Sequence, residues 1–441
     1  MFKECKYSKR QARVSPLFQL LQDHWGDFTA EYGEYFEPQV GSLRTRIETV
    51  VGQFLECGLL DFGFARIRCE QCKLELFLPF SCKSRTFCPS CAAKRELFFE
   101  EFLLEEVLEP NISHRHVVFT VPKRLRGFFL RDRHLLADLS RLGYESLVEV
   151  MRQELELPTG RGAAVIVAQT FGSLLDFTPH AHALVAWGLF NAEGHYTGVM
   201  NVPPDVVEAV FRHKVFRFLL DLDLITEATV SNMLSWHHSG FSVFIGPSVH
   251  AFERDRLGQL ARYMIRGPIA LSRLVYEPGV GTPEDKDSKA LERARGVPCE
   301  GKVSYHASKN HHKYGKNQRV WTPLLFLLDL IRHIPERHQK LVNYYGWYSN
   351  RTRGERKKRL EAEKGEGPCC TVVQKRLTLG HWRRFIKLIY EVDPLICPNC
   401  EVEMRVVSCL NDPDVIFKIL AHTKLLGKDQ KYRACGRAPP R

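Results

Sequence analysis

The sequence contains no apolar stretch long enough to cross a membrane. The most apolar run of its 441 residues is WTPLLFLLDLI at residues 321–331, whereas a transmembrane helix needs about 20 apolar residues. The opening segment MFKECKYSKRQ carries charges but lacks the apolar segment of a signal peptide. Both absences predict a soluble, cytoplasmic protein with no membrane partner.

Acidic residues are fewer than basic ones. The chain has 51 Asp and Glu against 63 Lys and Arg, which gives a net charge of +12. This excess indicates a polyanionic partner such as nucleic acid, although a merely solvated basic surface has the same composition. The phosphate-binding loop GxxxxGK[ST] is also missing, so the sequence shows no helicase motor. With 44% apolar residues, the chain can build two or three globular domains.

Cysteine, in contrast, is abundant and clustered. The chain has 14 cysteines, and residues 69–95 read CEQCKLELFLPFSCKSRTFCPSCAAKR. The pairs Cys69/Cys72 and Cys88/Cys91 have the spacing of zinc knuckles, and together they could present four thiolates to one tetrahedral Zn²⁺. Disulfides are the alternative, which a cytoplasmic location disfavours. Cys82 is either an alternative ligand or a packed bystander.

A further CxxC motif lies near the end of the chain, in LICPNCEVEMRVVSC. Cys397 and Cys400 form the CxxC pair, and only Cys409 follows at short range. The pair is either half of a zinc site that a distant Cys or His completes, or two buried free thiols.

The apolar pattern predicts a mixture of strands and helices without an internal repeat. Strands are expected at residues 116–122, 162–171, from 182 onward and 241–246. Helices are expected at residues 43–60, 92–108, 128–156, 203–224, 253–274 (interrupted near Gly267 and Pro268) and 323–333. This irregular order predicts an α+β fold rather than repeated βαβ units. Residues 279–301 read as an exposed loop.

Two histidines stand on one predicted strand, in the segment TPHAHALVAW at residues 178–187. Because side chains alternate between the two faces of a strand, His180 and His182 must point the same way. Two adjacent imidazoles can hold a metal ion with one more ligand from a neighbouring element. They can also be ordinary polar residues at the end of a strand.

A tyrosine about eighty residues downstream gives this pair a chemical context. Tyr263 lies in LARYMIRGPIALSRL on a predicted helix, between Arg262 and Arg266. A phenol flanked by cations can meet a phosphodiester and attack it to give a tyrosyl-phosphate, while a metal ion stabilises the transition state. Taken alone, Tyr263 would be interpreted as an ordinary amphipathic core residue.

The ordered combination of these segments resembles the IS91 and ISCR transposases, rolling-circle enzymes of the HUH endonuclease superfamily. The resemblance extends from about residue 50 to 420 and rests on SCKSRTFCPSC, the His-x-His strand, LARYMIRGPIALSRL, TPLLFLLDLI, NYYGWYSN and CPNC. It implies an HUH-type antiparallel sheet with packed helices in residues 109–278. A zinc-binding domain would precede it in residues 1–108, and a mainly helical basic region would follow in residues 279–441.

The same resemblance implies cleavage and rejoining of single-stranded DNA, at transposon ends and target, through a 5′-phosphotyrosine. Tyr263 would be the nucleophile, and His180 and His182 would hold Mg²⁺ or Mn²⁺. Gln169 on the neighbouring strand is the candidate third ligand, with Asp176 as the second choice. Structural Zn²⁺ would occupy the cysteine module.

The sequence departs from the founding members of this group at one informative position. They carry two tyrosines four residues apart, whereas here Gln259 stands four positions before Tyr263. The chain therefore resembles a single-tyrosine branch, in which Tyr263 acts twice or a second protomer of a homo-oligomer contributes. Ala181, between the histidines, is smaller than the bulky residue usual there.

Basic residues interleaved with aromatics predict a path for single-stranded DNA. Besides Arg262 and Arg266, residues 301–320 supply the cations Lys302, Lys309, Lys313, Lys316 and Arg319 and the aromatics Tyr305 and Tyr314. The dense run RTRGERKKR at residues 351–359 could contact DNA in the same way, but so dense a cluster of charges favours a solvated linker.

Two other functions share parts of this pattern. A plasmid-type replication initiator or relaxase would have the same histidine pair and tyrosine. A non-catalytic zinc protein that binds DNA would need the cysteines and the basic surface alone. Substitution of Tyr263 separates an enzyme from a binding protein.

Overall fold

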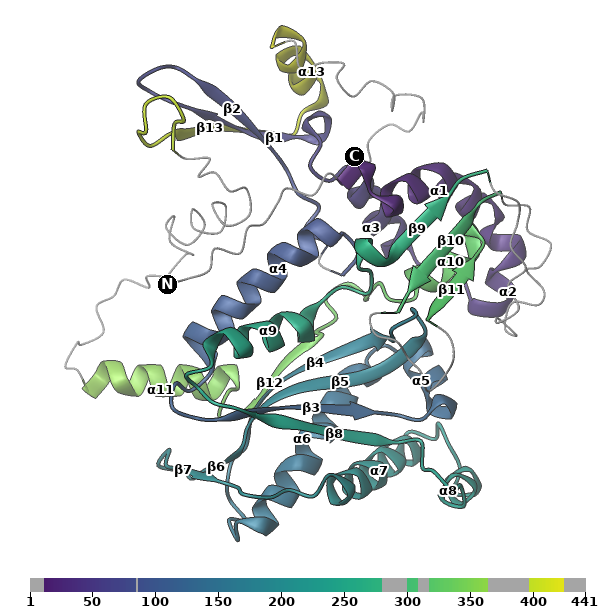
Figure 1. The fold of residues 1–441 in the computed structure, drawn as a ribbon, viewed down its shortest axis with the longest axis vertical. Helices are drawn as coiled ribbons and strands as arrows, with labels where there is room; N and C mark the ends of the chain where they lie inside the picture. Colours follow the sequence, from purple (N-terminus) through teal and green to yellow (C-terminus); the bar gives the residue numbers. More distant parts are fainter. Residues whose placement is uncertain (1–11, 85, 280–299, 308–316, 364–395, 424–441) are drawn as a thin grey trace. The chain divides into compact units, whose positions relative to one another are not determined.

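The computed structural model describes residues 12–84, 86–279, 300–307, 317–363 and 396–423 (Figure 1). The chain divides into two compact units, and each unit combines segments that are separated in the sequence. Unit 1 comprises Met1–Phe18, Glu48–Ser84 and Val373–Arg441, and unit 2 comprises Gln19–Ile47 and Arg85–Val372. The C-terminal segment thus shares a unit with residues near the N-terminus.

Unit 2 is built on one antiparallel sheet of five strands. Their order is β12 (Val342–Gly346), β4 (Ala163–Phe171), β5 (Phe177–Ala186), β3 (His114–Thr120) and β8 (Ser242–Val249). Every neighbouring pair in this sheet is antiparallel. The predicted mixture of helices with an antiparallel sheet is therefore confirmed.

Helices cover both faces of this sheet (Figure 1). On one face, α6 (Leu135–Glu154) and α7 (Pro204–Asp221) pack against side chains such as Ala181 and Ala183. On the other face, α4 (Pro89–Phe102) and α9 (Arg254–Ile265) pack against Val165 and Leu184. The near-continuous apolar character of β4 and β5 follows from this double burial.

The other elements are shorter or peripheral. The helices are α1 (Pro16–Tyr35), α2 (Glu37–Val40), α3 (Thr45–Leu55), α5 (Arg126–Arg131), α8 (Glu227–Leu234), α10 (Pro323–Ile331) and α11 (Asn350–Glu363), with a π-helical turn at Leu103–Val107. The strands are β6 (Gly188–Phe190), β7 (Tyr196–Gly198), β9 (Leu274–Glu277), β10 (Lys302–His306) and β11 (Gln318–Trp321). In the described part of the chain, no helix combines the length and the apolar character needed to cross a bilayer.

Two segments differ from the expectation. Residues 351–359 were expected to be a solvated linker, but they belong to α11, because a run of Lys, Arg and Glu has good helix propensity without any apolar face. The helix expected over residues 253–274 breaks near Gly267 and Pro268 as expected, because α9 ends at Ile265, but no α-helix follows the break: a 3-10 turn at Leu271–Arg273 leads into β9 at Leu274.

The described strands of unit 1 form a small sheet. Strand β1 (Phe64–Arg68) lies between β13 (Arg405–Leu410) and β2 (Glu75–Pro79), and both pairings are antiparallel. Helix α13 (Pro413–His422) packs Ile416 and Leu420 against Phe64. Two segments far apart in the sequence thus share one small core.

Candidate active site and thiol groups

Three histidines meet on the sheet face that α9 covers. His180 and His182 project from β5, and His116 projects from β3. The Nε2 atoms of His180 and His182 are 3.0 Å apart, and Nδ1 of His182 is 2.9 Å from Nε2 of His116. His182 therefore has another imidazole at each of its ring nitrogens.

Hydrogen bonding fixes which nitrogen of His180 is free to bind a metal ion. Its Nδ1 lies 2.7 Å from the carbonyl oxygen of Thr178, which can only accept, so Nδ1 carries the proton and Nε2 keeps a lone pair. Two neighbouring ligands about 2.1 Å from an octahedral ion lie about 3 Å apart. The 3.0 Å between the Nε2 atoms of His180 and His182 fits such an ion.

Burial keeps these imidazoles neutral. It lowers the pKa of His180 and of His116 to about 4, and it holds the pKa of His182 well below its usual value. At neutral pH the three rings are therefore uncharged, which is the form that binds metal ions.

Tyr263 stands beside this cluster on α9. Its ring centroid lies 5.3 Å from that of His182 and 6.0 Å from that of His116. The side chain is 41% exposed. It borders a cleft of about 560 Å³ together with the three histidines, Val118, Phe244 and Leu260. A cleft of that volume is large enough for a nucleotide.

Arg266 places a positive charge next to Tyr263. Its guanidinium carbon lies 4.4 Å from the centroid of the Tyr263 ring. Within the described residues no carboxylate pairs with Arg266, and its buried Nε has no hydrogen-bond partner. Arg262, one residue before Tyr263, instead forms an ion pair with Glu100 at 3.2 Å.

The packing of α9 explains why Tyr263 faces the cleft. Leu257, Ala261 and Met264 recur at helical spacing and are buried, whereas Tyr263 and Gln259 lie on the exposed side. The Arg262–Glu100 ion pair then joins α9 to α4. The tyrosine is held on a packed helix rather than on a loop.

Gln169 lies directly across the β4–β5 pair from His180. Its amide nitrogen donates to the carbonyl oxygens of Met264 at 2.6 Å and Tyr263 at 3.4 Å, so it holds the last turn of α9. Its buried Oε1 accepts no hydrogen bond from the described residues. Asp176, the other candidate ligand, pairs with Arg319 at 3.2 Å.

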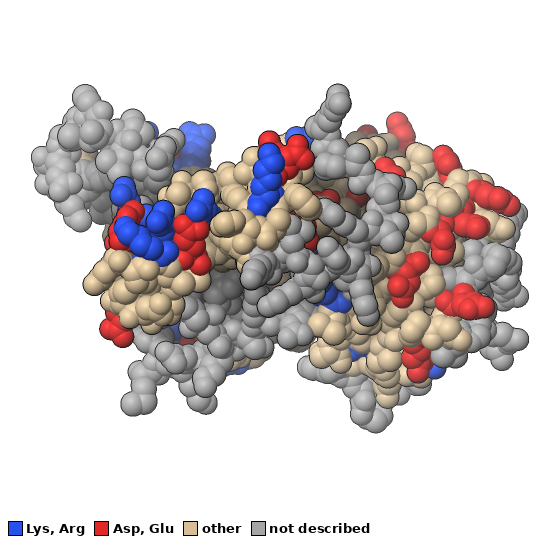
Figure 2. Space-filling model, turned by 90° about the horizontal axis from the view of Figure 1, so that it is seen from above, with Lys and Arg blue, Asp and Glu red and all other residues tan. Residues whose placement is uncertain are grey.

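The other residues expected to bind DNA are in part engaged elsewhere. Arg319 also binds Asp329 at 2.9 Å, and Lys302 binds Glu277 at 3.0 Å. Tyr305 is fully buried, so its ring cannot stack on a base. Lys309, Lys313, Tyr314 and Lys316 lie outside the described residues. On the face drawn in Figure 2, the described Lys and Arg side chains are interspersed with Asp and Glu and form no continuous basic surface.

The cysteines pair differently from the expectation. The sulfurs of Cys69, Cys72, Cys397 and Cys400 all lie within 4.8 Å of one another, so Cys397 and Cys400 take the place expected for Cys88 and Cys91. The sequence could not show this partnership because strand pairing between β1 and β13 creates it. Cys409, on β13, is exposed and belongs to neither thiol group of the described chain.

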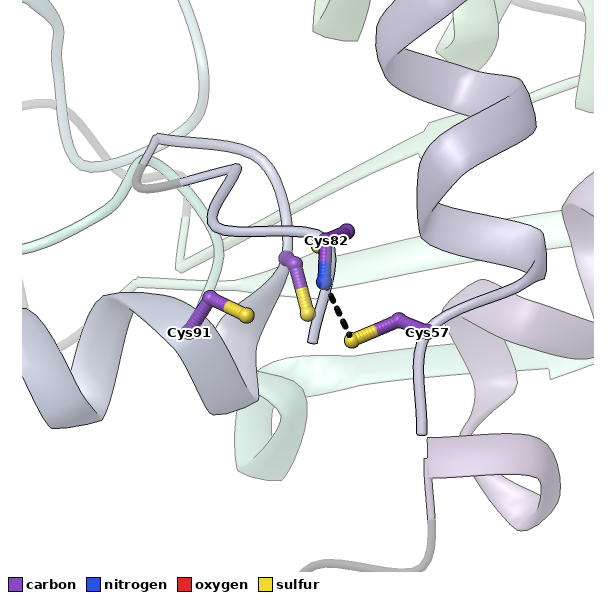
Figure 3. Close-up of side chains that lie close together, drawn as sticks. Cys57, Cys82 and Cys91 are labelled. Atoms are coloured by element: carbon purple, nitrogen blue, oxygen red, sulfur yellow. Dashed lines mark hydrogen bonds between the residues drawn. The ribbon is translucent and has the colours of Figure 1, made fainter. Parts of the chain in front are cut away.

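Cys88 and Cys91 fall into the other thiol group. Their sulfurs lie within 4.8 Å of those of Cys57 and Cys82. The backbone N–H of Cys82 donates to Sγ of Cys57 at 3.3 Å (Figure 3). Cys82 is thus in the position of a ligand, and Cys57 is a member that the sequence pattern missed because it belongs to no CxxC motif.

A backbone amide favours the thiolate form at Cys72. The hydrogen bond from Leu74, with smaller contributions from neighbouring thiols, lowers the pKa of Cys72 to about 7. Thiolates are the form in which cysteine binds zinc.

Comparison with known proteins places these features in a family. Residues 20–121 match the transposase zinc-binding domain, and residues 163–280 match a family described as "Putative transposase". The chain is 24% identical over 399 residues to the transposase for insertion sequence element IS801 of Pseudomonas savastanoi pv. phaseolicola, covering 84% of this chain and 86% of that protein. It is 24% identical over 351 residues to the putative transposase y4qJ of Sinorhizobium fredii, covering 74% and 80%. No solved structure is significantly similar.

The matched domains, the antiparallel sheet and the thiol groups define a transposase with a zinc-binding domain. Within that class, the two matched domains and the similarity to the IS801 transposase support an IS91-family transposase. It is accordingly a DNA-processing enzyme.

Proposed function

We propose that the chain cleaves and rejoins single-stranded DNA, with Tyr263 as the nucleophile. The position of Tyr263 carries the proposal: a half-exposed phenol 5.3 Å from a buried histidine ring, in a cleft lined by three histidines. Transposition requires strands to be broken and rejoined, and a nucleophile beside metal-ligating imidazoles is suited to that chemistry.

In the cleavage step, the phenol oxygen of Tyr263 bonds to the phosphorus of a phosphodiester as the bond to the 3′ oxygen breaks. The phenol loses its proton, and the leaving 3′ oxygen gains one to become a hydroxyl. The 5′ end stays joined to Tyr263, and attack by another 3′ hydroxyl reverses the step. The energy of the phosphodiester is kept, so no nucleotide hydrolysis is needed.

His180 and His182 are the proposed metal ligands, with Gln169 Oε1 as the third donor across the strand pair. A bound Mg²⁺ or Mn²⁺ would neutralise charge on the non-bridging phosphate oxygens. Nitrogen ligands favour Mn²⁺ over Mg²⁺. With the metal ion on Nε2 of His182, its Nδ1–H would donate a hydrogen bond to Nε2 of His116, which would orient that ring.

Arg266 and Phe244 are the proposed contacts for the DNA strand. Arg266 has no acidic partner among the described residues, so its charge can balance a phosphate next to Tyr263. Phe244 lies in the same cleft and is 55% exposed, which allows its ring to stack on a base. Arg262, Lys302 and Arg319 would need to exchange their carboxylates for phosphate.

The single tyrosine has a consequence for the complete reaction. Gln259 is exposed one turn before Tyr263 and offers no second nucleophile. Two cleavages then require that Tyr263 act twice or that a second protomer supply its own tyrosine.

The zinc-binding domain is proposed to hold Zn²⁺ through Cys57, Cys82, Cys88 and Cys91.

The test uses the full chain, long circular single-stranded DNA and Mn²⁺. We expect a covalent protein–DNA adduct on denaturing gels, with the attached nucleotide mapped to Tyr263 by mass spectrometry. Tyr263→Phe should lose the adduct and keep DNA binding.

Tyr35→Phe is the matched control, because Tyr35 is a partly exposed tyrosine on α1 that does not line the cleft. It should form as much adduct as the unchanged chain. An adduct that persists in Tyr263→Phe would overturn the assignment of the nucleophile. DNA binding without any adduct in the unchanged chain would instead indicate a non-catalytic binding protein.

A further inference from the structure

Two CxxC motifs in unit 1 form equivalent turns although they lie far apart in the sequence. Cys72 and Cys397 are 325 positions apart, and their sulfurs are 3.4 Å from each other. In each motif, the N–H of the first cysteine donates to the carbonyl five residues later, Cys69 to Leu74 at 2.8 Å and Cys397 to Val402 at 2.9 Å. Equivalent turns at both places show that the two motifs are the same structural unit.

The residue after each second cysteine completes the equivalence. Lys73 and Glu401 have φ angles of 63° and 57°. The left-handed region is uncommon for residues other than glycine. Each also donates its N–H to the carbonyl of the first cysteine of its motif, at 3.0 Å and 2.9 Å. This turn directs two sulfurs to one side, as a metal-binding knuckle requires.

Strand pairing brings the two knuckles to the same end of the small sheet. Cys69 follows directly on β1, and β13 begins five residues after Cys400. Arg68 at the end of β1 pairs with Arg405 at the start of β13. The four sulfurs therefore converge, and Cys69 and Cys397 are both fully buried.

We infer that Cys69, Cys72, Cys397 and Cys400 form a four-thiolate Zn²⁺ site that closes the C-terminal segment onto the segment that contains β1 and β2. This site goes beyond the proposed DNA chemistry and does not depend on it. The matched zinc-binding domain ends at residue 121, so it contains only half of these ligands.

Little apolar packing joins the two segments. The buried residues around the knuckles are Ile67, Met404 and the two cysteines Cys69 and Cys397, and among the described residues a further small core joins Phe64 to Ile416 and Leu420. Three short strands with so few buried side chains are marginally stable in water, and metal binding then supplies the folding free energy. Loss of the C-terminal segment would leave Cys69 and Cys72 without a complete site.

The first experiment measures zinc bound to the full chain by elemental analysis. We expect the double variant C397S/C400S to bind one Zn²⁺ per chain fewer than the unchanged protein. Cys409→Ser is the matched control, since Cys409 is an exposed cysteine on β13 outside both thiol groups, and its zinc content should not change. Unchanged zinc content in the double variant would overturn the site.

A second experiment needs no variant and so does not depend on how the variants fold. Cys72 and Cys409 are both exposed, so without metal both should be alkylated readily. In the zinc-loaded chain, Cys72 should react about tenfold or more slowly than Cys409, and chelation should remove this protection of Cys72. Equal reaction of Cys72 and Cys409 in the zinc-loaded chain would refute the inference.

Discussion

At the scale of single residues, His182 is the centre of the candidate active site. Its Nε2 faces His180 and its Nδ1 faces His116. If a metal ion takes the two Nε2 atoms, Nδ1 of His182 must carry the proton and donate a hydrogen bond to Nε2 of His116. His116 then orients a ligand without binding the metal ion itself.

This geometry predicts a graded effect on metal binding. In the zinc-loaded full chain, His116→Ala should weaken Mn²⁺ binding by about tenfold to 100-fold, the range for loss of a group that orients a ligand. His182→Ala should remove high-affinity binding altogether. Titration of free Mn²⁺ by electron paramagnetic resonance measures both effects.

His195→Ala is the control, because His195 is exposed and does not line the cleft. Its Mn²⁺ affinity should equal that of the unchanged chain. If His116→Ala were as severe as His182→Ala, His116 would be a direct ligand. If it had no effect, the hydrogen bond to His182 would have no role in metal binding.

The sequence could predict the histidine pair but not the third histidine. Alternation along a strand is enough to place His180 and His182 on one face. His116 approaches them because β3 pairs with β5 in the register that sets Val118 opposite His182. No local spacing encodes that register.

At the scale of elements, β12 is the part of the sheet that the apolar pattern did not predict. It is short, and its partly buried residues Tyr344 and Tyr345 lack the apolar alternation typical of longer strands. Pairing with β4 and a stacked contact between Tyr345 and Tyr144, with centroids 4.9 Å apart, hold it at the edge. Strands β4 and β5 were predictable because both are long and buried.

Gly346 ends β12, and we expect this position to be sensitive to substitution by any residue with a side chain. Its φ is 57°, and a Cβ added there would clash with the Tyr144 hydroxyl and with the carbonyl oxygen of Gly162. Neither the backbone nor the packed strand can yield, so Gly346→Ala should lower the free energy of unfolding by about 2–4 kcal/mol. Urea denaturation measures the change.

Gly354→Ala provides the comparison, because a Cβ at Gly354 in α11 would meet no atom within 4 Å. Alanine in a helix is better than glycine by about 0.5–1 kcal/mol, so this variant should be equal to or more stable than the unchanged chain. Equal stability of Gly346→Ala and Gly354→Ala would contradict the described turn at the end of β12.

At the scale of the whole molecule, the partnership between the CxxC motifs could not be predicted because it depends on contacts between segments that are distant in the sequence. The CxxC spacing identified each cysteine pair as a knuckle, but sequence proximity suggested that Cys69 and Cys72 belong with Cys88 and Cys91. The partner pair lies on a segment that returns to the same unit from the other end of the chain. Pairing of β1 with β13 provides that long-range contact.

We expect the buried side chain of His333 to make the stability of unit 2 depend on pH. His333 is packed between Phe171 and Phe177, bonded to Thr170 Oγ1 at 3.0 Å and to the Leu175 carbonyl at 3.1 Å. Burial lowers its pKa to about 4. The unfolded chain, with a histidine pKa of about 6.5, binds more protons below that pH. The contribution of His333 to stability is therefore complete above about pH 6.5 and declines as the pH falls toward about 4, by at most about 3 kcal/mol.

The variant His333→Gln isolates this contribution, because an amide can hydrogen-bond but does not titrate. It should be less stable than the unchanged chain near about pH 7.5, and the difference should shrink near about pH 5, where the histidine is penalised. The other buried histidines titrate in both proteins and cancel in the difference. Urea unfolding followed by tryptophan fluorescence at the two pH values measures it, and a difference that is independent of pH would show that His333 is not buried as a neutral imidazole.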